Sequence, residues 1–92
     1  SVGDAIDALH SAYARLQAMP EIGAEVTGPL EVDGVSALAD SAVLIRVRIR
    51  TTAGMQYAVG RAYNRCVKEQ FDAAGIEIPY PHRTVYFGAG EE

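Results

Sequence analysis

The stretch AVLIRVRIR at residues 42–50 restricts the possible folds more than any other part of the sequence. Its side chains alternate: Val43, Ile45, Val47 and Ile49 are apolar, and the positions between and after them carry Leu44, Arg46, Arg48 and Arg50. Successive side chains of a β-strand point to opposite faces of a sheet. The stretch therefore predicts a strand with one face in an apolar core and one charged face, and such a one-sided sheet needs a covering layer.

A long amphipathic helix at residues 54–74 is predicted to supply that layer. One side carries apolar or small residues, namely Met55, Val59, Ala62, Tyr63, Cys66 and Ala73. The opposite side is charged and carries Arg61, Arg65, Lys68, Glu69 and Asp72. This periodicity is typical of a surface helix, and Gly75 suits a left-handed C-cap. We expect Val59, Tyr63 and Cys66 to be buried against the apolar face of the strand.

A second helix and a hairpin partner precede this strand. Residues 4–19 predict a helix that Pro20 ends, with one apolar face made of Ile6, Leu9, Tyr13 and Leu16. A loop at residues 20–29 follows. Residues 30–38 predict a strand with a bulge at Asp33-Gly34, and a turn at residues 39–41 leads into the alternating strand.

The chain continues past its last helix in an unusual way. We predict a short strand at residues 76–78, a stiff Pro79-Tyr80-Pro81 link that cannot be a central strand, and a β-rich run at residues 82–87. The order favours an α+β, ferredoxin-like two-layer sandwich whose first strand is absent, with an extra C-terminal strand. We therefore divide the chain into a domain at 1–78, a link and strand at 79–87, and a disordered tail at 88–92.

Composition excludes several kinds of function. The 92 residues have the length of one domain, and the net charge of −4 argues against non-specific binding to nucleic acid or anionic membrane. The single cysteine, Cys66, excludes an internal disulfide, and we expect it to be packed in the core. Together with His10 and His82 it shows no metal-ligand spacing, and there is no phosphate-binding glycine loop. We expect no catalysis, no cofactor and no metal.

The three arginines of the alternating strand form the best candidate binding face. A sheet that binds RNA needs aromatic side chains on which bases stack, and this strand has none. We therefore expect no nucleic-acid partner, and we interpret Arg46, Arg48 and Arg50 as the solvated side of a half-covered sheet, with a subunit contact as the alternative.

The run at residues 82–87 has no obvious partner within its own sheet. An unpaired strand edge is prone to aggregation, and pairing with other chains is the usual solution. Identical copies around an axis would close such strands into a barrel without edges. We predict that nine residues form a subunit interface: Pro79, Tyr80, Pro81, His82, Arg83, Thr84, Val85, Tyr86 and Phe87.

The segments ADSAVLIRVRIRT, YNRCVKEQFDAAGIEIPYP and HRTVYF together resemble the carboxy-terminal end of the small-conductance mechanosensitive channel family. In that family an amphipathic helix ends in a run like K-E-x-F-D-x-A-G-I, followed by P-[YF]-P and a final strand. Residues 68–76 and 79–81 match this pattern. The resemblance is strong over residues 39–87 and weaker over residues 4–38.

The resemblance implies a structural role. Such channels are heptamers in the bacterial inner membrane that open under tension and release solutes during osmotic downshock. By position, residues 1–78 would form part of the wall of a cytoplasmic vestibule, and residues 82–87 would be a strand of the barrel at its base. The resemblance also implies membrane-spanning helices upstream of these residues. This sequence itself has no run apolar and long enough to span a bilayer. The alternative is a free-standing ferredoxin-like regulatory or RNA-binding domain.

Overall fold

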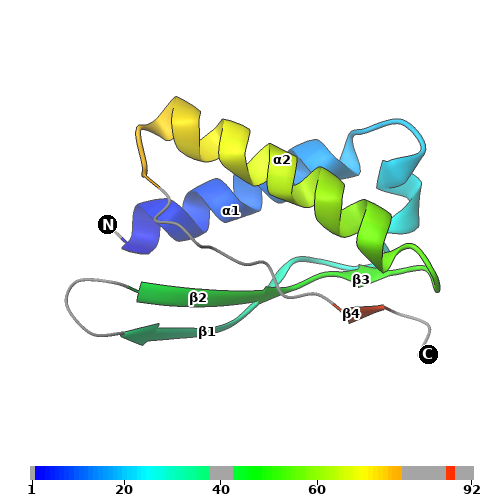
Figure 1. The fold of residues 1–92 in the computed structure, drawn as a ribbon, viewed down its shortest axis with the longest axis horizontal. Helices are drawn as coiled ribbons and strands as arrows, with labels where there is room; N and C mark the ends of the chain where they lie inside the picture. The colour runs from blue at the N-terminus through cyan, green and yellow to red at the C-terminus, as the bar shows by residue number, and fades with distance from the viewer. Residues whose placement is uncertain (1, 38–42, 78–86, 89–92) are drawn as a thin grey trace.

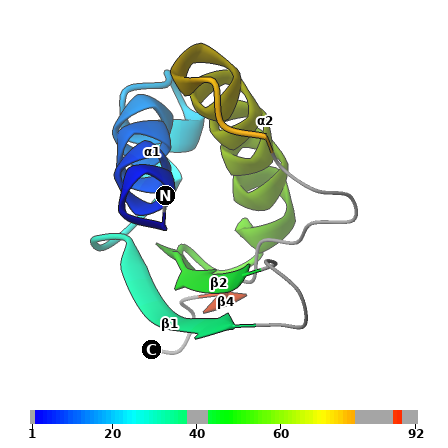
Figure 2. The same cartoon turned by 90° about the vertical axis from the view of Figure 1, so that its left-hand side faces the viewer.

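The computed structural model describes residues 2–37, 43–77 and 87–88 of the chain. Its elements in order are α1 (Val2–Gln17), the 3-10 helix η1 (Ile22–Glu25), β1 (Glu31–Ala37), β2 (Val43–Arg48), β3 (Arg50–Thr51), α2 (Gln56–Ala74) and β4 (Phe87–Gly88). The two α-helices lie side by side over one face of the strands, so the chain forms a helical layer on a β layer (Figure 1, Figure 2). The predicted α+β class is confirmed.

The hairpin of β1 and β2 follows the predicted alternation. The two strands are antiparallel, with Glu31 opposite Arg48 and Ala37 opposite Val43. The register shifts between Val32 and Gly34, which confirms the predicted bulge. The turn predicted at residues 39–41 lies outside the described residues.

The second strand of the hairpin is divided at Ile49, and its continuation β3 has a neighbour on each edge. On one edge, Thr27 donates its backbone N–H to the Arg50 carbonyl at 3.0 Å, and Thr52 donates to the Glu25 carbonyl at 2.9 Å. On the other edge, β4 pairs with β3 in parallel, with Arg50 opposite Phe87 and Thr51 opposite Gly88. A strand has two edges, so both edges of β3 are in use.

The helix ends lie within two residues of the predicted ones. Helix α1 ends at Gln17, two residues before the predicted Met19, and the loop that we expected from Pro20 contains η1. Helix α2 begins at Gln56 rather than Gly54.

The C-terminus of α2 confirms the predicted glycine cap. Gly75 is left-handed at φ 72° and donates its N–H to the Asp72 carbonyl at 3.2 Å, while Ile76 donates to the Phe71 carbonyl at 2.9 Å. This is the Schellman pattern, which only a residue tolerant of positive φ supports easily.

The core lies between the helices and part of the sheet. Val59 and Tyr63 are fully buried and Cys66 is 6% exposed, which confirms that these residues are buried. Tyr63 contacts Leu9 and Tyr13 of α1, so burial of all three against the apolar face of the strand stays a prediction. Burial along the apolar face of the strand is uneven: Val47 is 3% exposed, but Val43 is 41% exposed. The helices therefore cover one end of the hairpin, and the expectation that the whole face is buried is wrong at Val43.

Two expectations near the C-terminus need correction. Ile76 and Glu77 are not in a strand, because Ile76 completes the helix cap instead; Ile78 lies outside the described residues. Gly88, which we expected to begin a disordered tail, pairs with Thr51.

Candidate functional site

The arginine face of the hairpin is paired with carboxylates of β1. Arg48 Nη1 lies 3.4 Å from Glu31 Oε1, and Arg48 Nη2 lies 3.2 Å from Asp33 Oδ2. Arg50 Nε lies 3.9 Å from the second Glu31 oxygen, Oε2. Arg46 lies opposite Gly34 and makes no ion pair with any residue that the structure describes. A phosphate ligand at this face would have to compete with carboxylates already in place.

Sequence reasoning overlooked this pairing, although a signal was present. Glu31 and Asp33 lie in the predicted partner strand. Opposite charges on facing residues of an antiparallel pair attract one another, and the register sets Glu31 opposite Arg48. The observed pairs support the interpretation of this face as a half-covered, solvated side of the sheet.

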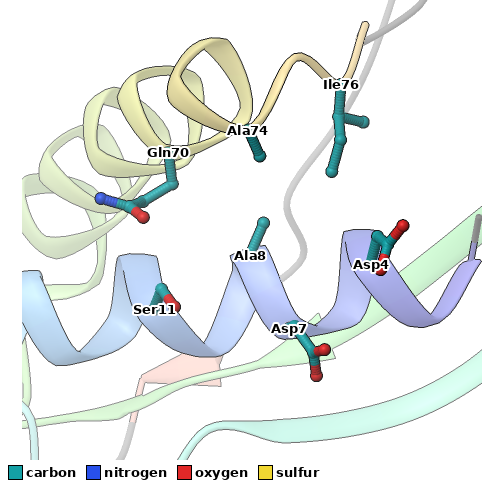
Figure 3. Close-up of a pocket in the computed structure, with 7 residues that line it drawn as sticks. All are labelled: Asp4, Asp7, Ala8, Ser11, Gln70, Ala74 and Ile76. Carbon is teal, nitrogen blue, oxygen red and sulfur yellow. The ribbon is translucent and has the colours of Figure 1, made fainter.

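A groove lies between the start of α1 and the end of α2. It has a volume of about 390 Å³ and is lined by Asp4, Asp7, Ala8, Ser11, Gln70, Ala74 and Ile76. Ala8 and Ala74 face each other across it, while Asp7 points away from α2 (Figure 3). Its lining, as far as the described residues show it, contains no histidine or cysteine, and these are the side chains most often found in nucleophile–base pairs. Within the described ranges, no group of three or more His, Cys, Asp or Glu residues could hold a metal.

Cys66 is placed as a core residue. Burial, and next the carboxylate of Glu69, raises the pKa of its thiol, while Arg15 and Arg65 act in the opposite direction. Since the thiolate is the reactive form, a buried thiol with a raised pKa is a poor nucleophile. His10 is exposed on α1, and His82 lies outside the described residues.

Two tyrosines join the helices to each other and to the following loop. Tyr63 donates its hydroxyl to the Leu9 carbonyl at 3.0 Å, and Tyr13 donates to the Gly28 carbonyl. Their rings meet edge to face, with centroids 6.3 Å apart and planes at 76°. Burial raises the pKa of both phenols, so both stay neutral donors. Sequence periodicity placed these rings in the core but did not identify their hydroxyl partners.

The predicted subunit interface falls mostly outside the described residues. This is true of the eight residues 79–86, so their role stays a prediction. Phe87 is described, and its backbone belongs to β4, which is paired with β3 of the same chain. Any role of Phe87 between chains must therefore be reconciled with a partner that it already has.

No helix in the described part of the chain is long and apolar enough to cross a membrane. Comparison of the chain with protein-family models, with curated proteins and with solved structures finds no match.

Proposed function

We propose that the chain is the carboxy-terminal cytoplasmic domain of a tension-gated mechanosensitive channel subunit. In this role it contributes to the wall of a vestibule and helps the subunits assemble in a channel that releases solutes during osmotic downshock. The observation that carries the proposal is the run KEQFDAAGI followed by PYP. The left-handed cap at Gly75, where α2 ends, agrees with the position of the glycine in that run.

The fold supports the proposal at a coarse level. An antiparallel hairpin, the amphipathic helix α2 and the parallel strand β4 follow one another in the order that the family resemblance implies. Strands β3 and β4 are joined by a helix and run parallel, as in a βαβ unit. A ferredoxin-like sheet would separate these two strands with one more, placed before α1 in the chain.

The remaining parts of the proposal concern assembly. Residues 79–87 form the subunit contact, with the Pro-Tyr-Pro link directing the final strand toward the axis of a homo-heptamer. The membrane is reached through helices upstream of this domain, in the bacterial inner membrane, and the domain lies on the cytoplasmic side. No catalytic step, cofactor or nucleic acid takes part.

The complete polypeptide provides the test. We expect its coding sequence to specify apolar spans of about 20 residues upstream of Ser1. We also expect it to restore survival after osmotic downshock in bacteria that lack their own mechanosensitive channels, and to give a tension-gated conductance in membrane patches. A stop codon after residue 78 should weaken subunit assembly, whereas one after Gly88 should not. A polypeptide without spans, or one whose patches are silent under tension, would contradict the proposal.

The free-standing RNA-binding alternative has less support. Glu31 and Asp33 pair with two of the three arginines of the sheet. Tyr57, a strongly exposed aromatic residue, lies at the start of α2 in the helical layer and not on the sheet. Single-stranded nucleic acid is normally bound on a basic surface that carries stacking aromatics.

A further inference from the structure

Strand β4 occupies one edge of β3. Residues 25–27 pair with one edge of β3, and β4 takes the other, through the pairs Arg50–Phe87 and Thr51–Gly88. Thr51 is fully buried, whereas Arg50 is exposed. Figure 1 shows β4 beside β3 at the end of the sheet where α2 begins. We call this edge of β3 the strand seat.

Pairing at the strand seat conflicts with pairing between copies. In a closed barrel every strand uses both of its edges for neighbouring strands. A strand on β3 has one edge occupied by its own domain, so it offers a single edge to other chains. A ring that includes Phe87 of every chain therefore cannot close while Phe87 is paired with β3. Phe87 belongs both to β4 and to the predicted interface, so the two pairings compete for the same backbone.

We propose that the strand seat is an autoinhibitory contact for self-assembly. It holds the chain's own C-terminal strand while the chain is separate, and this strand must leave β3 before it pairs with other copies of the chain. The inference rests on the proposed function, because the competing partner is the C-terminal strand of another copy.

A disulfide across the strand seat tests the inference. Neighbouring strands lie about 4.8 Å apart, which is within the range of about 4.4–6.8 Å between the Cα atoms of a disulfide. The variant carries Arg50→Cys and Phe87→Cys, and Cys66→Ala removes the only other cysteine. Intact mass and peptide mapping show whether the bond forms within one chain. Light scattering over a range of protein concentrations then compares the oxidised and reduced forms.

The β1–β2 hairpin supplies a matched control. Val35 and Ile45 are opposite one another in its register, so Val35→Cys with Ile45→Cys, again with Cys66→Ala, locks a pair of strands that does not include β4. Oxidation of this control should leave self-association unchanged. Circular dichroism of both variants, oxidised and reduced, verifies that each is folded.

We expect the Arg50–Phe87 disulfide to form within one chain. The oxidised variant should stay monomeric at concentrations at least tenfold above those at which the reduced variant associates. Three results would overturn the inference: no intrachain disulfide, equal association of the two forms, or no association of the reduced form at any concentration. These results are separable from failure of the proposed function, which is judged on tension-gated conductance of the complete polypeptide.

Discussion

The close approach of η1 to the end of α1 predicts that Gly23 cannot be replaced without strain. A Cβ atom added at Gly23 would lie 2.9 Å from the Gln17 carbonyl carbon, closer still to the Gln17 oxygen, and 3.1 Å from the Leu16 oxygen. These are backbone atoms, so no side chain can rotate away. Gly23 also donates its N–H to the Met19 carbonyl at 3.0 Å, which holds η1 in place.

The loss of stability expected for Gly23→Ala can be estimated by comparison with a second glycine, Gly34. Gly34 has nothing within 4 Å of an added Cβ and does not have a positive φ. Replacing either glycine with alanine restricts the unfolded chain similarly, which stabilises a protein by roughly 0.4–1 kcal/mol where the native conformation allows it. That gain cancels in the difference between Gly23→Ala and Gly34→Ala. The overpacking strain remains, at about 1–3 kcal/mol.

Urea denaturation followed by circular dichroism measures this difference directly. We expect Gly23→Ala to be about 2 kcal/mol less stable than Gly34→Ala. In a domain of this size, that corresponds to roughly 10 °C in melting temperature. The slopes of the two transitions should agree, because the surface exposed on unfolding is the same. Equal midpoints for the two variants would mean that η1 does not pack against the end of α1, and the reasoning would be refuted.

Further predictions concern the core and the charged face. Val59→Asp should lower the free energy of unfolding by about 3 kcal/mol or more, because it buries an unpaired carboxylate. The control Tyr57→Asp, at a position 67% exposed, should change the free energy of unfolding little. Equal losses for the two variants would contradict the burial of Val59. Tyr63→Phe should cost about 1 kcal/mol in the same urea assay, by removing the bond to the Leu9 carbonyl. Burial raises the pKa of Tyr63 above 10.0, so the stability linked to its neutral phenol is complete below pH 10.0 and is lost as the pH rises further. The tyrosinate absorbance of Tyr63 should therefore appear only as the chain unfolds. Ionisation of all five tyrosines in a chain that is still folded would contradict this. Arg48→Gln should lower the free energy of unfolding by at most about 1 kcal/mol, and by less at high salt, whereas Arg46→Gln should leave it unchanged. Equal urea midpoints for the two variants at low salt would contradict a stabilising role of the Arg48 ion pairs.

The elements that sequence predicts well are those determined by short-range periodicity. The alternation that begins at Val43 and the apolar stripe through Val59 and Tyr63 each describe an element that is amphipathic on its own. The cap at Gly75 depends on the freedom of one residue to adopt a positive φ. In each case the cause lies within a few residues of the effect.

The features that the sequence did not predict depend on how distant elements are placed relative to one another. Val43 belongs to the apolar face but is 41% exposed, because burial depends on how far the helices reach along the hairpin. Val67 and Phe71 are buried although the predicted stripe omitted them. Helix α2 packs against α1 as well as the sheet, so its buried surface is wider than one stripe. The sequence of one helix does not show that a second helix will pack against it.

The candidate interface shows the same limit. Sequence indicated that a strand after Pro79-Tyr80-Pro81 needs a partner, but a strand's preference for pairing does not identify which edge it meets. The structure places Phe87 on β3, an edge formed by residues far earlier in the chain. No periodicity within residues 82–87 distinguishes this intrachain edge from one on another copy.

The C-terminal strand can pair with β3 of its own chain or with other copies, and the balance between these two pairings depends on protein concentration. Separate chains favour pairing at the strand seat. Pairing of β4 with β3 is intramolecular, so its population does not change when the protein is diluted. Closing a ring brings several chains together, and the lost translational and rotational freedom must be recovered from short strands alone. Attachment of each domain to a subunit already assembled in a membrane would remove most of that loss. In the proposed channel, therefore, the upstream assembly supplies the local concentration that draws the C-terminal strand from β3 to its neighbours, and the seat prevents closure before that assembly exists.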